Sequence, residues 1–221
     1  MAQLMPAYDV VLFDLDGTLT DPQLGITKSI QYALARYDIA VDDLATLVPL
    51  IGPPLHTSFQ QEYGFSEEQA FAAVDVYREY FTVTGIYENR VHPGIPALLD
   101  ALRRAGCTLV VATSKPTIFA ERILEHFLLR HHFAAVVGSN LDGTRTAKAE
   151  VICDALAAVP AHSERRSVMV GDREHDIIGA HDNHIDVVAV AYGYGSLDEL
   201  QAAAPTAIVA TIADLYEWLL R

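Results

Sequence analysis

Two aspartates, Asp14 and Asp16, directly follow the apolar run VVLF and lead into Gly17 and Thr18. Side chains two positions apart on an extended strand point to the same face, so these two carboxylates are expected to lie side by side. Like charges at that spacing repel each other unless a cation or a proton joins them. The pair therefore suits a carboxylate nucleophile placed beside a carboxylic acid.

More polar side chains follow other expected strands. In open parallel sheets, ligands bind at the carboxyl ends of the strands. The candidates are Thr113, Ser114 and Lys115 after TLVVA, Lys148 at the start of a helix, and Asp172 and Asp176 in GDREHD. Taken singly, each has an ordinary explanation, because hydroxyls and acids cap helices and lysines lie on solvated faces. Their convergence on one sheet edge favours a single site.

The elements that would position these residues alternate between valine-rich strands and helical patterns. Such alternation predicts an α/β fold, a Rossmann-like parallel sheet covered on both faces. The expected strands cover residues 10–13, 107–113, 134–138, 167–172 and 187–193, and the expected helices cover 116–129, 147–158, 176–183 and a last segment through Trp218. The stretch GYGYGS after the last of these strands lacks the full GxGxxG fingerprint and is predicted to be a loop.

A different kind of segment lies between the first strand and Pro93. Residues 21–87 hold no convincing strand and show amphipathic helical patterns around 27–37, 55–63 and 67–81. Pro22 on one side, and Pro93 with Gly94 on the other, fit two linkers that leave and rejoin the core. The predicted organisation is a discontinuous α/β core of residues 1–20 and 88–221 with an all-helical insertion of residues 21–87.

The composition of the chain limits the classes of molecule that it is expected to bind. The 221 residues carry a formal net charge of -14, which disfavours binding to nucleic acid polymers or to an anionic membrane surface. No apolar run has the roughly 18 residues that a membrane span requires, and the first residues lack the pattern of a secretory signal. Cys107 and Cys153 form no CxxC pair and indicate a reducing compartment. We expect a cytoplasmic protein.

Together these motifs resemble the haloacid dehalogenase superfamily of phosphohydrolases, in the group with a helical cap after the first strand. The resemblance spans essentially the whole chain. The first family motif, hhhhDxDGT, is met by VVLFDLDGT; the second by Thr113; the third by Lys148; and the fourth, GDxxxD, by GDREHD. The first and fourth together are specific, whereas the second and third are weak alone.

The resemblance implies a role for each carboxylate. Asp14 would attack phosphorus to give an aspartyl-phosphate, and Asp16 would protonate the leaving alcohol and later deprotonate water. Mg²⁺ would be held by Asp14, Asp172 and the backbone carbonyl of Asp16, with Asp176 in a second shell or bound through water. An aspartate at position 16 also favours phosphate ester cleavage over dehalogenation, because expelling halide needs no proton donor.

The resemblance also assigns the phosphoryl contacts. Thr113 and Lys148 would donate hydrogen bonds to the phosphoryl oxygens, and Lys148 would pair with Asp14 in the resting site. Ser114 and Lys115, next to the second motif, are candidate substrate-binding residues; a lysine at a helix start explains Lys115 equally well.

The substrate and the oligomeric state are less defined by the sequence. Gly52 and Pro53, in LIGPPL, resemble a cap loop that reads the leaving group, and an ordinary turn explains them equally well. The segments TSKP, SNLDGTRTAK and GDREHDIIGA resemble a 5'-nucleotidase-like branch close to the phosphoglycolate phosphatases. The expected substrate is a small phosphate ester, a 5'-nucleotide or 2-phosphoglycolate, acted on by a monomer or homodimer. A sugar phosphomutase and a catalytically silent binding protein are the alternatives.

Overall fold

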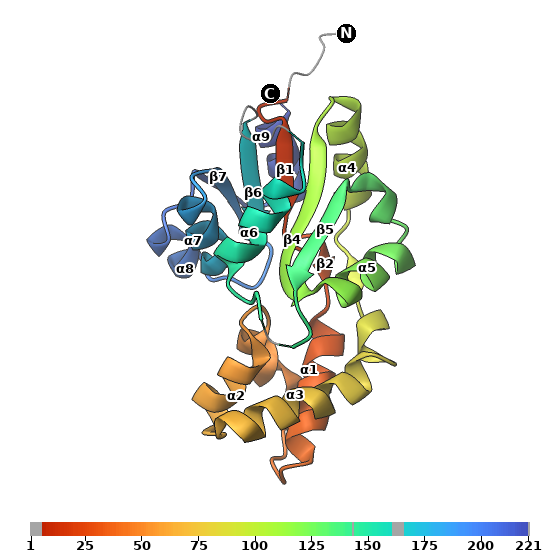
Figure 1. The fold of residues 1–221 in the computed structure, drawn as a ribbon, viewed down its shortest axis with the longest axis vertical. Coiled ribbons are helices and arrows are strands. Elements are labelled where there is room, and N and C mark those ends of the chain that lie inside the picture. Colours follow the sequence, from red (N-terminus) through yellow and green to blue (C-terminus); the bar gives the residue numbers. More distant parts are fainter. Residues whose placement is uncertain (1–5, 143, 161–165, 221) are drawn as a thin grey trace. The chain divides into compact units, whose positions relative to one another are not determined.

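The computed structural model describes residues 6–142, 144–160 and 166–220, and the chain divides into two compact units. The first unit combines the chain up to Thr20 with the chain from Val91 onward, and the second consists of Asp21–Arg90 (Figure 1). The sequence placed the second boundary near residue 87. Here the units are called the α/β unit and the helical unit.

The α/β unit is built on a six-stranded sheet whose pairs are all parallel, in the order β5-β4-β1-β6-β7-β8. The strands are β1 (Val10–Phe13), β4 (Thr108–Pro116), β5 (Ala135–Ser139), β6 (Ser167–Gly171), β7 (Asp186–Val190) and β8 (Ala207–Val209). The predicted α/β class is therefore confirmed. The first strand of the chain, β1, lies inside the sheet between β4 and β6, which explains why all four of its residues are buried.

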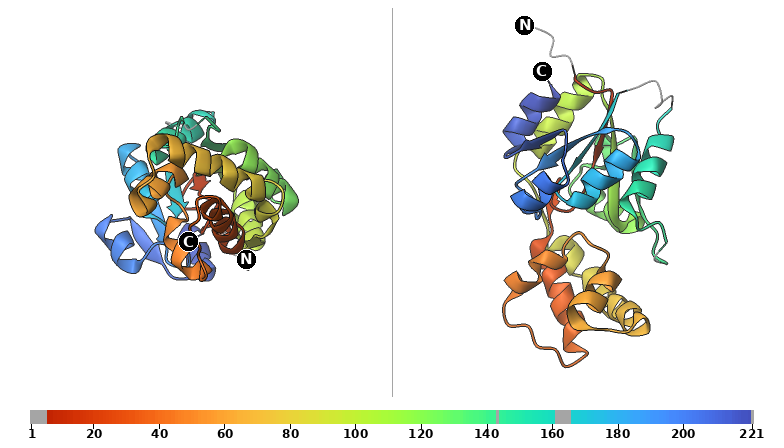
Figure 2. Two further views of the ribbon diagram at one scale, coloured as in Figure 1. Left: turned by 90° about the horizontal axis from the view of Figure 1, so that it is seen from below. Right: turned by 90° about the vertical axis from the view of Figure 1, so that its left-hand side faces the viewer.

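Helices cover both faces of this sheet. They are α4 (Ile95–Arg104), α5 (Thr117–His126), α6 (Lys148–Ala157), α7 (Glu174–Asp182), α8 (Leu197–Ala202) and α9 (Ile212–Leu219), with a 3₁₀ turn η3 (Arg130–His132). The side view in Figure 2 shows α6 and α7 on one face and α4 and α9 on the other. Helices α4 and α8 and strand β8 were not among the predicted elements.

The helical unit comprises α1 (Gln23–Ala35), η1 (Leu44–Leu50), α2 (Leu55–Tyr63), α3 (Glu67–Phe81) and η2 (Gly85–Tyr87). The last two α-helices have the predicted bounds, and α1 begins four residues earlier than expected. Ser66 and Gln69 form a capping box that starts α3, each side chain bonded to the other's backbone N–H. A Cβ on Gly25 would lie 1.9 Å from the carbonyl oxygen of Gly85, so this contact between α1 and η2 requires glycine.

The two connecting segments, β2 (Thr20–Asp21) and β3 (Arg90–Val91), pair with each other in a small two-stranded sheet. The Arg90 guanidinium donates from Nε and Nη2 to Asp21 Oδ2, at 2.9 and 2.6 Å. The chain therefore leaves and re-enters the α/β unit through adjacent strands.

Candidate active site

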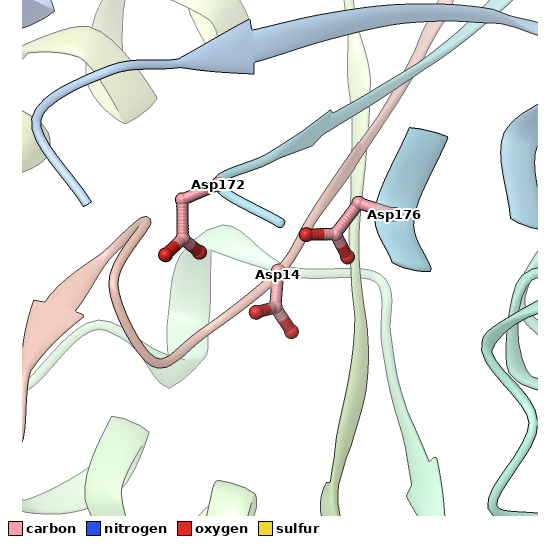
Figure 3. A group of neighbouring side chains, drawn as sticks. All are labelled: Asp14, Asp172 and Asp176. Atoms are coloured by element: carbon pink, nitrogen blue, oxygen red, sulfur yellow. The ribbon is translucent and has the colours of Figure 1, made fainter. Parts of the chain in front are cut away.

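Three carboxylates meet at the carboxyl edge of the sheet. Asp14 follows β1 and its N–H still donates to the Val170 carbonyl at 2.9 Å; Asp172 follows β6; and Asp176 lies in the first turn of α7. All three are buried, and one oxygen from each can be chosen so that the three lie within 4.8 Å of one another (Figure 3). The sequence predicted this convergence, because parallel strands end at a common edge.

Lys148 neutralises part of this acidic group. It is the first residue of α6, as expected, and its Nζ lies 2.7 Å from Asp14 Oδ1 and 2.7 Å from Asp176 Oδ1. Burial by itself lowers the pKa of Lys148, but the charges of Asp14 and Asp176 outweigh it and raise the pKa above its usual value. The ammonium therefore stays charged and holds both carboxylates in place.

Asp16 has a lysine of its own. Lys115 Nζ lies 2.5 Å from Asp16 Oδ2, and the two side chains are only 6% and 13% exposed. Burial raises the pKa of Asp16, and the nearby charge of Asp14 adds to this effect while Lys115 opposes it. The two aspartates of the first motif are thus each paired with a different lysine.

Thr113 and Ser114 lie in the last part of β4, beyond Val111, the last residue of β4 that pairs with β1. Thr113 is buried and its Oγ1 accepts a hydrogen bond from the Lys115 N–H at 3.3 Å. The carbonyl of Ser114 accepts a hydrogen bond from the Ser139 hydroxyl at 2.8 Å, which ties β4 to β5. The strand continues to Pro116, past the predicted end at Thr113, so both hydroxyl residues belong to the sheet edge.

Asp172 is enclosed by a loop that sequence reasoning left without a role. Its Oδ2 accepts from the Tyr194 N–H at 2.8 Å and its Oδ1 from the Thr18 hydroxyl at 3.1 Å. A Cβ on Gly193 would lie 2.3 Å from Asp172 Cβ, and a Cβ on Gly17 would lie 2.2 Å from Asp172 Oδ2. Only residues without a side chain fit against this carboxylate.

The same loop reaches the first motif through Tyr192. The Tyr192 hydroxyl donates to the Thr18 carbonyl at 3.1 Å, and the Gly195 N–H donates to the Asp172 carbonyl at 3.1 Å. Two glycines closely spaced after a strand were the only signal in the sequence for this loop, since its bonds to Asp172 come from the backbone N–H groups of Tyr194 and Gly195. We call residues 192–195 the Asp172 loop.

The residues present fit a divalent cation. Four carboxylates, those of Asp14, Asp16, Asp172 and Asp176, are accompanied by two lysines, so with all four carboxylates ionised the buried site would carry two uncompensated negative charges. Burial, followed by the charges of Asp176 and Asp14, raises the pKa of Asp172 well above its usual value. Carboxylate oxygens are the ligands that Mg²⁺ prefers, and a cation among them would remove this repulsion.

Gly52 and Pro53 are placed elsewhere in the chain, in the helical unit between η1 and α2. Gly52 has φ +110°, a conformation that favours glycine, so a turn accounts for its residue type. Their predicted contact with the leaving group is taken up below as part of a proposal.

The α/β unit gathers buried carboxylates, a lysine bonded to two of them and the buried Thr113 hydroxyl at one sheet edge, an arrangement suited to phosphoryl transfer. The family model for haloacid dehalogenase-like hydrolases matches residues 11–190. The chain belongs to this family, as its motifs predicted.

Most of the similar proteins described here are named as phosphatases or nucleotidases, and one is named as a kinase. A 5'-nucleotidase of Pseudomonas aeruginosa is 53% identical over 96% of both chains, and a phosphoglycolate phosphatase of Agrobacterium fabrum is 31% identical over 86% of this chain and 83% of its own. The crystal structure of a predicted phosphatase from Clostridium acetobutylicum superposes with TM-score 0.91 at 48% identity, covering 96% and 98% of the two chains. The tyrosine-protein kinase PtkA of Mycobacterium tuberculosis is 41% identical over 95% of this chain and 72% of its own.

These findings confirm a haloacid dehalogenase-like phosphatase that acts on small phosphate esters. Phosphatases of this family generally use Mg²⁺, and the buried acidic triad is suited to it. Within the described part of the chain, no helix is both long and apolar enough to cross a membrane.

Proposed function

We propose that this enzyme is a Mg²⁺-dependent phosphate monoesterase that works through an aspartyl-phosphate on Asp14, with a 5'-nucleotide as the first candidate substrate and 2-phosphoglycolate as the second. The observation that carries the proposal is the setting of Asp14. Its carboxylate is buried at a strand end, bonded to Lys148 at 2.7 Å and grouped with two further carboxylates. The names of the nucleotidase and phosphoglycolate phosphatase relatives support the choice of substrates.

The reaction would proceed in two displacements. In the first, an oxygen of Asp14 forms a bond to phosphorus while the bond from phosphorus to the ester oxygen breaks, and Asp16 gives that oxygen its proton. In the second, Asp16 takes a proton from water, the water oxygen bonds to phosphorus, and inorganic phosphate leaves as Asp14 is regenerated. Thr113 and Lys148 donate hydrogen bonds to the phosphoryl oxygens, where negative charge develops.

Asp14, Asp172 and the backbone carbonyl of Asp16 would hold the metal ion, with Asp176 fixing Lys148 or acting through water. When bound, Mg²⁺ supplies positive charge that lets an anionic nucleophile approach an anionic phosphate. The buried Lys148 supports the same approach from the protein side.

We assign the helical unit the function of a cap that excludes water and contacts the substrate beyond its phosphate. Gly52 and Pro53 are our candidates for leaving-group contacts from this unit, and Ser114 is the candidate from the α/β unit. The cap is the part in which related phosphatases with the same catalytic residues are expected to differ, so it is where specificity for a nucleotide or a smaller acid would arise.

A panel of phosphate monoesters, assayed for released phosphate with and without Mg²⁺, tests the proposal. We expect a 5'-nucleotide or 2-phosphoglycolate to be the best substrate and activity to vanish in EDTA. Turnover of sugar phosphates alone would refute the substrate assignment, and conversion of glucose 1-phosphate to its 6-isomer would indicate a phosphomutase instead. Because one relative is named a tyrosine kinase, ATP with a tyrosine peptide belongs in the panel; phosphopeptide formation without ester hydrolysis would overturn the hydrolase assignment.

A further inference from the structure

Lys115 lies where the pairing of β4 with β5 is irregular. Ala112 pairs with Val137 and Pro116 pairs with Ser139, so β4 advances four residues while β5 advances two. Extra residues of this kind form a bulge, and bulges redirect the side chains that they carry. The direction of the Lys115 side chain therefore depends on this irregularity rather than on simple alternation along the strand.

The backbone around Lys115 is held by specific contacts. A Cβ on Gly138 would lie 2.2 Å from the Lys115 carbonyl oxygen, so β5 approaches this residue as closely as only glycine allows. The Gly138 N–H donates to the Thr117 hydroxyl oxygen at 2.9 Å, and the Ser139 hydroxyl donates to the Ser114 carbonyl at 2.8 Å. These contacts fix the chain immediately before and after Lys115.

The target of Lys115 is one particular oxygen of Asp16. The Nζ of Lys115 contacts Asp16 Oδ2, whereas the buried Asp16 Oδ1 has no hydrogen-bond partner among the described residues. Buried polar atoms nearly always have a partner, so an unpaired carboxylate oxygen at a catalytic edge indicates a place for a ligand. Lys115 therefore binds Oδ2 of Asp16, and Oδ1 is the oxygen that can contact a reacting group.

We propose that Lys115 is a positioning residue for Asp16, which binds Oδ2 so that Oδ1 faces the leaving-group oxygen and, in the second displacement, the attacking water. The inference rests on the proposed function of Asp16 as proton donor and acceptor. It differs from the sequence-based expectation that Lys115 contacts the substrate. The site then contains two matched pairs, with Lys148 holding the nucleophile and Lys115 holding the acid.

A positioning role predicts a dependence on the leaving group. An alkyl phosphate expels a strongly basic alkoxide and needs a well-placed proton donor, whereas p-nitrophenyl phosphate expels a stable phenolate and needs little help. Loss of Lys115 should therefore slow the first displacement, which kcat/KM reports, more for alkyl esters than for the aryl ester. The second displacement is the same for both substrates. A residue that contacts the phosphate would lower kcat/KM for both substrates alike.

The experiment compares Lys115→Met with the wild-type enzyme on a 5'-nucleotide and on p-nitrophenyl phosphate. We expect kcat/KM for the nucleotide to fall about tenfold to hundredfold, because small misplacements of catalytic groups cost about this much, and kcat/KM for the aryl ester to change less than about threefold. Lys115→Arg should recover part of the loss. Lys28→Met, which removes a lysine paired with Glu88 at 2.5 Å in the helical unit, is the matched control and should not alter the ratio of the two rates.

A second set of variants separates positioning from other roles. Because Lys115 would act through Asp16, adding Lys115→Met to Asp16→Asn should cause little further loss. Equal losses of kcat/KM on both substrates, or losses that add in the double variant, would each overturn the inference. If Lys115→Met does not fold by circular dichroism, Lys115→Gln takes its place in the same comparison.

Failure of the underlying function gives a different result. If the wild-type enzyme released no phosphate from any ester, or if Asp14→Asn kept its activity, the proposed function would fail before Lys115 was tested. A selective loss on alkyl esters in Lys115→Met can arise only when the function holds.

Discussion

Replacing Gly193 with alanine should weaken metal binding although it replaces no metal ligand. The added Cβ would lie 2.3 Å from Asp172 Cβ and 2.5 Å from its Oδ2, distances that real atoms do not reach, so Asp172 and the loop must move apart. The bond from the Tyr194 N–H to Asp172 Oδ2, now 2.8 Å, would be lost or stretched. A hydrogen bond to a charged group contributes about 1.5–3 kcal/mol, and about 1.4 kcal/mol corresponds to a tenfold change in affinity. We therefore expect the Mg²⁺ dissociation constant to rise about tenfold to hundredfold.

Isothermal titration of the substrate-free enzyme with Mg²⁺ measures this constant directly, and the Mg²⁺ dependence of phosphate release gives a second reading. Gly106→Ala is the matched control. Gly106 has φ +93°, so alanine is strained there, but nothing lies within 4 Å of the new Cβ. That variant should lose some thermal stability and keep its Mg²⁺ affinity.

The result that would refute this reasoning is an unchanged dissociation constant in a folded Gly193→Ala protein. It would mean that Asp172 needs no support from the Asp172 loop, or that Asp172 does not bind the ion. Asp172→Ala distinguishes these cases, since it should abolish binding only if Asp172 is a ligand.

Three other predictions concern catalysis and stability. Asp14→Asn should reduce phosphate release at least about a thousandfold with an unchanged circular dichroism spectrum, because the amide oxygen can still accept from Lys148; substantial residual turnover would show that the nucleophile is misassigned. Burial, together with the neighbouring His131, lowers the pKa of His132 below its value in an unfolded chain. The unfolded state therefore takes up a proton first, and the free energy of unfolding should fall as the pH drops below about 6.5. The melting temperatures measured at pH 7.5 and at pH 5.5 should differ less in His132→Asn than in the wild-type protein. Ser66→Ala removes the capping box of α3 and should cost about 1 kcal/mol of unfolding free energy in urea, and a loss below about 0.3 kcal/mol would contradict that role.

The parts of the site that could be predicted are those in which the side chain itself carries the signal. Asp14 and Asp16 follow an apolar run, and Lys148 begins a helix, as the sequence indicated. The sheet edge then brings them near Asp172, because parallel strands share a direction. Side-chain type and chain direction were sufficient for these residues.

Other parts depended on backbone geometry that residue types do not record. The pairing of Lys115 with Asp16 depends on a bulge. Nothing in the sequence TSKP indicates that β4 has two more residues than β5 between the same two pairing positions. The bond from the Asp172 loop to the Asp172 carboxylate comes from the N–H of Tyr194, a group that every residue except proline has. Only the nearby Gly193 and Gly195 indicated that this loop approaches another part of the chain closely, and glycines after a strand are also common in ordinary loops.

Three elements of the fold were not predicted, and the reasons differ between them. Helix α8 has six residues and β8 has three, too few for a period to emerge. Helix α4 is different, because Leu98, Leu99 and Leu102 have helical spacing and are buried. That pattern was present in the sequence and predicts a helix.

The central position of β1 has a consequence for how the protein is made. Val10 pairs with Thr108 on one side and with Ser167 on the other, so β1 leaves the ribosome before both of its partner strands and must wait for them. The helical unit is contiguous in the chain and can complete its contacts in the meantime. Domains generally fold as units during synthesis, and long-range pairing is slow. We expect the nascent chain to pass through a stage with folded helices and an exposed VVLF segment, in which a chaperone would have its main opportunity to bind.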